Sequence, residues 1–476
     1  MNDNYFNSKE FKNILSLFEN SQKEGKDCIL SSEEFTDIAE YYNARGWQEK
    51  AVNVAQYALY IYPKASAPLL FLAKSEVVIN RDIVKAREYL KMISDTNYVD
   101  FFTIYAETFL MENNKEEALQ WLENATLVLE DDDLQDLYVD SAFLLLDYNM
   151  PEDAEAWARK IKDTESDEFI KLKARFCVGK GEFSKAISLL EKLIDNDPFC
   201  YDYWVLLSSV QLSCNMYSEA LTSIEYAIAI DSNIPDAYMY QGNAFLKLCN
   251  YDKALEAYCR YTEGSNSDVG YMLQGRCLFY MQNNSKAIEM LKTAESKCPN
   301  DRERQTDIYK DLAIIYGWVG DYSNAMLYVN KIKSHGIIDS ELFVIEGGIL
   351  LNMEKFEDAT QKFVQGYTFA ESQEAYLLQV AVSYYEHRYD SAAYKMLKEV
   401  HRINPENNQY APYFAACCFY LGKYDEFIKA LEIAVNETPD EAHTILADIF
   451  PAGLEPYDYV KYAKCHKFNG NNRKPE

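Results

Sequence analysis

The sequence has few of the residues that mark β-sheets or nucleic-acid-binding surfaces. Its 476 residues include only 17 glycines and 12 prolines, a content that suits helices joined by short turns. Lys and Arg total 47 against 76 Asp and Glu, so the net charge is −29. Because phosphate backbones bind by exchanging counterions for Lys and Arg, we do not expect a nucleic acid partner.

Signals for membranes, metals and catalysis are also missing. No apolar run approaches the roughly 18 residues of a membrane helix, and the N-terminal residues do not resemble a signal peptide, so we expect a cytoplasmic protein with no membrane span. The 11 cysteines form no CxxC pair and the five histidines no HxxxH pair. This pattern favours buried, reduced cysteines over zinc sites. We expect no metal, no cofactor and no catalytic residues, and therefore not an enzyme.

A small residue recurs about every 34 residues along most of the chain, each time after a polar turn. The spacings range from 32 to 38, and the positions are Ala51, Ala86, Ala118, Ala154, Ala186, Ala220, Ala254, Ala287, Ala325, Ala359 and Ala393, with Phe427 in a twelfth unit. Apolar residues follow four and seven positions later, which predicts one buried stripe on a helix. Self-similarity at this period is typical of helix–turn–helix repeats that pack on their neighbours.

Several units resemble the tetratricopeptide repeat, whose pattern alternates aromatic and small residues. The matching residues of one unit are Tyr238, Gly242, Phe245, Ala254 and Tyr258. Those of another are Tyr309, Leu312, Ala313, Tyr316 and Ala325. The resemblance covers about residues 31–438. It implies an all-α, right-handed α-solenoid superhelix of about twelve repeats.

The same pattern suggests how the chain is divided. We expect an N-terminal capping helix in residues 1–30, the repeat array in residues 31–438, and C-terminal capping helices with a polar tail in residues 439–476. The step from Ala287 to Ala325 is the longest, at 38 residues. We predict a hinge there, near residues 300–305.

In the family that this sequence resembles, the first helix of each repeat lines a concave groove. Counting from the start of each unit, the expected groove residues include Glu33, Glu40, Asp100, Glu107, Asp136, Asp236, Asn243, Arg276, Phe279, Tyr280, Lys310 and Trp318. The groove is thus predicted to be acidic in the early units and aromatic further on. The alternative is that the carboxylates are ordinary solvated faces and the aromatic residues are partly core. No three consecutive units carry the family's carboxylate-binding set, so capture of an acidic C-terminus is not expected.

These features favour a non-catalytic protein–protein interaction scaffold. Its partner would be a protein or peptide with a basic or amphipathic segment, bound in the acidic, aromatic-containing groove. The alternative is a regulatory or peptide-sensing accessory subunit of an enzyme or transcription complex. Both hypotheses leave open the oligomeric state and whether the C-terminal helix of the chain fills the groove.

Overall fold

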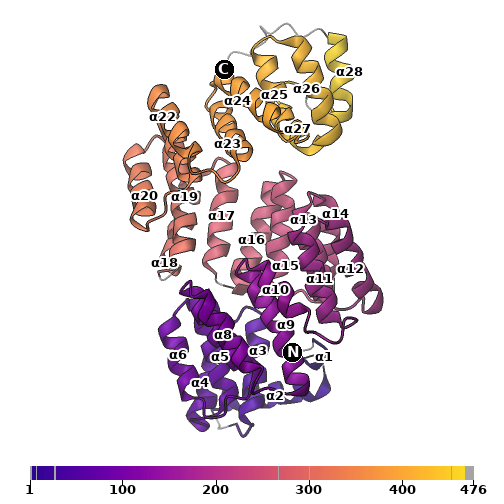
Figure 1. Cartoon of the computed structure of the whole chain (residues 1–476), viewed down its shortest axis with the longest axis vertical. Coiled ribbons are helices and arrows are strands. Elements are labelled where there is room, and N and C mark those ends of the chain that lie inside the picture. The colour runs from indigo at the N-terminus through magenta and orange to yellow at the C-terminus, as the bar shows by residue number, and fades with distance from the viewer. Residues whose placement is uncertain are drawn as a thin grey trace. The chain divides into compact units, whose positions relative to one another are not determined.

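A computed structural model describes residues 3–6, 8–25, 28–265, 267–299, 301–451 and 453–466, and all regular structure in these ranges is helical. Twelve helix pairs follow one another along the chain (Figure 1). The first helices of the pairs are α3 (Ser32–Ala44), α5 (Ser66–Ser75), α7 (Val99–Met111), α9 (Asp131–Asp147), α11 (Asp167–Gly179), α13 (Tyr201–Ser213), α15 (Pro235–Lys247), α17 (Asp268–Tyr280), α19 (Arg302–Trp318), α21 (Ser340–Asn352), α23 (Gln373–Glu386) and α25 (Ala411–Tyr420). The second helices are α4 (Gln48–Ile61), α6 (Ile83–Met92), α8 (Lys115–Ala125), α10 (Pro151–Ala158), α12 (Phe183–Asn196), α14 (Tyr217–Ile230), α16 (Tyr251–Ser265), α18 (Asn284–Lys297), α20 (Tyr322–Ser334), α22 (Phe356–Tyr367), α24 (Asp390–Ile403) and α26 (Tyr424–Glu437).

The predicted small residue lies in every second helix, and each is fully buried. All eleven alanines and Phe427 have 0% of their surface exposed. An alanine at this position lets two helix backbones approach closely, whereas in the twelfth pair the ring of Phe427 packs against Phe419 and Tyr424. The repeat register expected from the sequence is therefore confirmed.

A left-handed residue stands in every turn between paired helices, always five positions before the small residue. These residues are Gly46, Arg81, Asn113, Asn149, Gly181, Asn215, Cys249, Gln282, Gly320, Glu354, Arg388 and Gly422. The N–H that follows donates to a carbonyl five residues back, as from Asn114 to Phe109 at 3.0 Å and from Asp321 to Tyr316 at 2.9 Å. This bond satisfies a carbonyl that the helix end leaves unpaired.

In the second repeat, the hydrogen bond that closes this turn spans one residue more than in the other repeats. A π-helical segment, η1 (Glu76–Asn80), ends its first helix. The N–H of Asp82 consequently donates to the carbonyl of Glu76, six residues back, at 2.9 Å. Such a π-turn adds one residue to a helix without breaking the hydrogen-bonded chain.

The described chain divides into two compact units. Unit 1 comprises Met1–Cys277 and Ser296–Asp301, and unit 2 comprises Leu278–Glu295 and Arg302–Glu476. Within unit 1, first helices of neighbouring repeats pack on one another, as α3 on α5, α5 on α7 and α7 on α9. The same holds in unit 2 for α19, α21, α23 and α25. The first helices thus pack side by side from α3 to α11 and from α13 to α15 in unit 1, and from α19 to α25 in unit 2, as the family resemblance implies for a groove lining.

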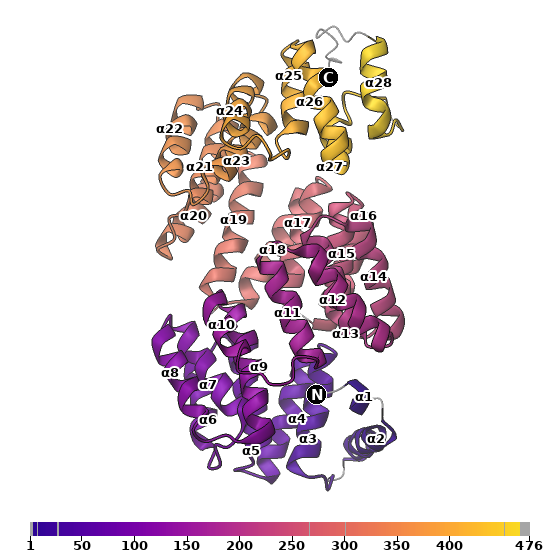
Figure 2. The same ribbon diagram turned by 45° about the vertical axis from the view of Figure 1, so that its right-hand side comes forward.

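Additional helices pack against the first and last repeats. At the N-terminal end, α1 (Asp3–Phe6) and α2 (Lys9–Glu24) precede the first pair, and the Phe18 ring lies 6.0 Å from that of Phe35. At the other end, α27 (Pro439–Leu446) and α28 (Pro456–His466) follow the last pair (Figure 2). The Tyr424 hydroxyl of α26 donates to the carbonyl of Ala463 in α28 at 2.8 Å. The C-terminal helix therefore packs against the last repeat.

Part of the remaining predictions falls outside the described residues. The polar tail from residue 467 onward does, and so does Asn300 of the predicted hinge. The chain passes between the two units at three places, after Cys277, Glu295 and Asp301, and the last two lie within the long repeat step. Motion at this place stays a prediction. No helix in the described ranges is both long and apolar enough to cross a membrane.

Candidate functional site: the acidic row of unit 1

A row of carboxylates follows the first helices of unit 1. We call it the acidic row, and its members are Asp37 and Glu40 of α3, Asp100 and Glu107 of α7, Asp136, Asp140 and Asp147 of α9, Glu168 of α11, Asp202 of α13 and Asp236 of α15. The cations that act on these groups are Lys74, Arg81, Lys171 and Arg175. The ten carboxylates thus outnumber the four cations, and the row carries an excess of negative charge.

The pKa values of these carboxylates reflect their burial first and their neighbours second. Burial and, after it, the charge of Asp100 raise the pKa of Asp140 to about 6, while Lys74 opposes the shift. Water still reaches the Asp140 side chain, but the chain surrounds it on most sides. Burial likewise raises the pKa of Glu40 and of Glu107. Clustered carboxylates behave in this way when no cation fully neutralises them.

Some members of the row are engaged with neighbouring repeats. Arg175 of α11 pairs with Asp147 of α9 at 2.6 Å, and Lys171 pairs with Glu168 at 2.7 Å. The Tyr148 hydroxyl donates to Glu107 at 3.3 Å. These contacts use two of the four cations.

The carboxylates in the middle of the row are available to a ligand. Among the described residues, Asp100, Asp136, Asp140 and Asp236 are exposed and make no ion pair. They come from α7, α9 and α15, so they span several repeats. A cationic partner could therefore neutralise them without breaking an internal contact.

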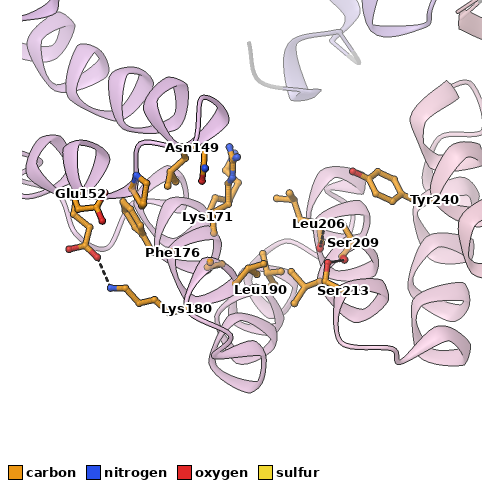
Figure 3. Close-up of a pocket in the computed structure, with 18 residues that line it drawn as sticks. Asn149, Glu152, Lys171, Phe176, Lys180, Leu190, Leu206, Ser209, Ser213 and Tyr240 are labelled. Atoms are coloured by element: carbon orange, nitrogen blue, oxygen red, sulfur yellow. Dashed lines mark hydrogen bonds and ion pairs between the residues drawn. The ribbon is translucent and has the colours of Figure 1, made fainter. Parts of the chain in front are cut away.

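A cavity of about 960 Å³ adjoins the row at the fourth to seventh repeats (Figure 3). Its apolar wall includes Phe176, Leu190 and Leu206. Figure 3 shows Tyr240 of α15 on the side away from Phe176. Lys180 and Glu155, which both line the cavity, form an ion pair of 2.5 Å.

Groups that interact with the acidic row line the cavity. Lys171, Arg175 and Tyr240 line the cavity. Burial raises the pKa of Tyr240, the charge of Asp236 raises it further, and Arg175 opposes the shift. The cavity is therefore a mixed apolar and polar recess beside the row.

The structure brings most of the predicted acidic residues together. Glu40, Asp100, Glu107, Asp136 and Asp236 all belong to the acidic row. Glu33 lies instead in the first turn of α3, where its own backbone N–H and the hydroxyls of Ser32 and Ser31 hold its pKa below the usual range.

The other predicted residues of unit 1 lie outside the row. Asn243 of α15 accepts a hydrogen bond from the Tyr258 hydroxyl of α16 at 2.9 Å, so it supports the packing of its own repeat. Arg276 is half-buried in α17.

The predicted residues of unit 2 form separate contacts. Lys310 of α19 pairs with Asp339 at 3.3 Å and with Glu341 at 2.5 Å. Trp318 stacks on His387 with 5.0 Å between ring centroids, and burial lowers the pKa of that histidine. The Phe279 and Tyr280 rings lie 6.2 Å apart.

Asp37, Asp140 and Glu168 of the row, and the cations Lys74 and Arg81, were not predicted. Asp140 follows Asp136 by one helical turn, so the two share a face of α9, and this spacing could have identified it. Glu168 lies in the first turn of α11, one position after the start of that helix. Lys74 precedes the π-turn of the second repeat, where the register cannot be counted from a regular helix.

Comparisons with known proteins agree with this architecture. The family model of the tetratricopeptide repeat matches residues 215–268. The chain is 21% identical over 398 residues to the TPR repeat-containing protein YpiA of Bacillus subtilis (strain 168). The matched region covers 80% of this chain and 90% of the relative.

Solved structures with a similar arrangement include that of yeast Tom70, with a TM-score of 0.45 and 14% identity over 92% of this chain and 96% of that one. Another is the human IFIT1 dimer with m7Gppp-AAAA, with a TM-score of 0.49 and 15% identity over 78% of this chain and 89% of that one.

The repeated helix pairs define an α-solenoid. Together with the family match over residues 215–268, the constant register of its twelve pairs supports a multi-repeat tetratricopeptide repeat protein. Repeats of this family typically serve as non-catalytic scaffolds for protein interactions.

Proposed function

We propose that unit 1 is a protein-interaction module that binds a basic segment of a partner protein along the acidic row. The observation that carries the proposal is the excess of carboxylates over cations on the first helices of unit 1. A Lys- or Arg-rich segment would offset the repulsion from Asp100, which adds to the effect of burial on the pKa of Asp140. Complementary charge of this kind speeds association and suppresses unsuitable partners.

The cavity beside the row adds a second element of recognition. Its wall of Phe176, Leu190 and Leu206 suits an aliphatic or aromatic side chain of the partner. Such a buried anchor contributes affinity and fixes the register of a bound segment. The preferred ligand is accordingly a basic segment with one large apolar residue.

A labelled peptide can test this function. We would use a 20-residue Lys-rich peptide that contains one Leu, and measure binding by fluorescence anisotropy at low and moderate salt. The variant Asp100→Asn/Asp136→Asn/Asp140→Asn should bind at least about tenfold more weakly, which corresponds to roughly 1.4 kcal/mol. Affinity for the parent protein should also fall as salt screens the charges.

A matched control separates the row from the overall charge of the protein. Glu123, Glu191 and Glu225 lie exposed on the second helices α8, α12 and α14. Their triple change to Gln removes the same three charges and should leave binding within about twofold. Equal weakening in both triple variants would contradict the proposal, because only net charge would then matter.

A further inference from the structure

The turn of the first repeat contacts the loop between the sixth and seventh repeats, within unit 1. Arg45, in the turn between α3 and α4, pairs with Asp231, in the loop between α14 and α15, with 3.3 Å between charged atoms. Both side chains are largely shielded from water, at 15% and 23% exposure. The residues are 186 positions apart.

The backbones meet at the same place. A Cβ on Gly46 would collide with the carbonyl oxygen of Gly264 and would lie 2.8 Å from Cγ of Pro235. A Cβ on Gly264 would also lie 2.8 Å from that Cγ. Glycine is therefore required on both sides of the contact, and at Gly46 the left-handed backbone, with φ of 74°, adds to this requirement.

A second contact of the same kind involves the turn of the second repeat. Arg81, in that turn, lies 3.7 Å from Asp301, in the loop after α18. Asp301 belongs to the segment Ser296–Asp301 that groups with unit 1. The turns of the first and second repeats thus contact the loops that follow the sixth and the eighth repeats.

Stacking alone does not produce such contacts, because each repeat of a solenoid touches only its neighbours. They require the array to curve until the edge of one superhelical turn rests on the edge of the next. The side of the groove is then covered by the chain itself. A groove of this kind is reached from its ends, or through the side once these contacts open.

We propose that unit 1 encloses its ligand and takes an extended, unfolded basic segment that enters by a free end. The inference rests on the proposed function of the acidic row. A segment held between two folded domains cannot thread through a closed side wall. It binds only when the contacts at Arg45 and Gly46 open.

Cross-linking can test two points together: that the contact between Arg45 and Asp231 closes the side of the groove, and that the ligand enters by a free end. The variant Arg45→Cys/Asp231→Cys, in a background with the exposed Cys249 and Cys465 changed to Ser, should form a disulfide without ligand, identified by peptide mapping. The probes are the Lys-rich peptide with free ends and the same peptide placed between two folded fluorescent proteins. The free-ended probe should bind the oxidised and reduced forms within about twofold. The doubly blocked probe should associate at least tenfold more slowly with the oxidised form.

The outcomes separate the two proposals. Equal association of the doubly blocked probe with both forms would overturn the enclosed mode of binding while leaving the acidic row as the site. Failure of the two cysteines to join, both as a disulfide and through a short bismaleimide that spans the length of the replaced Arg side chain, would overturn the closure itself. If the free-ended probe binds neither form, the proposed function fails, and the enclosed binding fails with it.

A glycine pair provides a variant that opens the contact without a cross-link. Gly181 stands at the same turn position as Gly46, with φ of 72°, but nothing lies within 4 Å of a Cβ built on it. Gly46→Ala and Gly181→Ala therefore add the same backbone strain, and only the first disturbs the contact. Gly46→Ala should speed association of the doubly blocked probe at least threefold, and Gly181→Ala should not. The same rate in both variants would count against closure.

Discussion

Gly347 of α21 lies directly against the ring of Phe363 of α22, with no space for a side chain between them. A Cβ on Gly347 would stand 2.5 Å from Cζ and 2.8 Å from Cδ1 of that ring. Gly242 has the same relation to Tyr258, whose Cδ1 would lie 2.6 Å from such a Cβ. Each glycine precedes the buried alanine of its repeat by twelve positions, and each ring follows it by four. This contact is thus a recurring feature of the repeat.

We expect Gly347→Ala to destabilise unit 2 by about 1–3 kcal/mol, because the added methyl group must displace the Phe363 ring. The adjacent Gly348 is a matched control in the same helix, since a Cβ there would meet only ordinary contacts of 3.5 and 3.6 Å. Gly348→Ala should stabilise by about 0.5–1 kcal/mol through helix propensity alone. Thermal unfolding followed by circular dichroism measures both. A shift of the same sign in the two variants would disprove the steric argument.

Asn243 was predicted to line the groove, and its contact with Tyr258 leads to a different expectation. Asn243→Ala leaves the Tyr258 hydroxyl without this acceptor in a fully buried ring. The variant should lose about 1–3 kcal/mol of stability and keep its affinity for the Lys-rich peptide within about twofold. Urea unfolding and anisotropy provide the two values. Tenfold weaker binding with normal stability would place Asn243 in the ligand site after all.

The raised pKa of Asp140 predicts how stability and binding depend on pH. Because its folded-state pKa of about 6 lies above the ordinary 3.8, the ionised group costs stability above pH 6, and this cost disappears as pH falls from 6 towards 4. Asp140→Asn should therefore raise the melting temperature at pH 7 and change it little near pH 4. Binding of the basic peptide should weaken as pH falls from 7 to 5, because the row loses negative charge.

Glu182 is a suitable comparison for the pH experiment. It is exposed, and its pairing with Lys185 holds its pKa below the usual range. Glu182→Gln should leave the fall in affinity between pH 7 and 5 unchanged, whereas Asp140→Asn should reduce it. A pH profile that Asp140→Asn does not alter would assign the titration to other groups.

The segment after α18 is expected to report on the predicted hinge. Amide hydrogen exchange at residues 301–305 should be faster than in the other inter-repeat loops. Arg81→Ala should increase it further, because this change removes the contact with Asp301. Lys297→Ala, in the same region, is a control that leaves Arg81 in place. Exchange at 301–305 no faster than elsewhere would exclude a hinge.

The repeat architecture was predictable because each unit repeats the same local solution. Ala51 and Ala393 are 342 residues apart, yet both are fully buried at the same place in a helix pair. The small residue, the apolar positions after it and the polar turn before it all reflect contacts within one repeat or with its neighbour. These contacts are short in sequence, so a single chain reveals them.

The acidic row was only partly predictable. Glu40, Asp100, Glu107, Asp136 and Asp236 followed from counting positions along regular first helices. Counting positions did not identify Lys74, which lies beside a π-turn. It also placed Glu33 in the groove, although the Glu33 carboxylate binds the N-terminus of its own helix. Side-chain position depends on such local departures as well as on register.

The amino-acid sequence alone determined the class of fold, the register of the twelve helix pairs and the acidic character of the early first helices. The tertiary structure decided which of those carboxylates influence one another and where the cavity opens beside them. It also decided that Arg45 meets Asp231. The reason is physical: helix pairs depend on contacts between residues close in sequence, whereas the curvature that brings distant repeats together is the sum of small rotations at every interface, and no single residue encodes it.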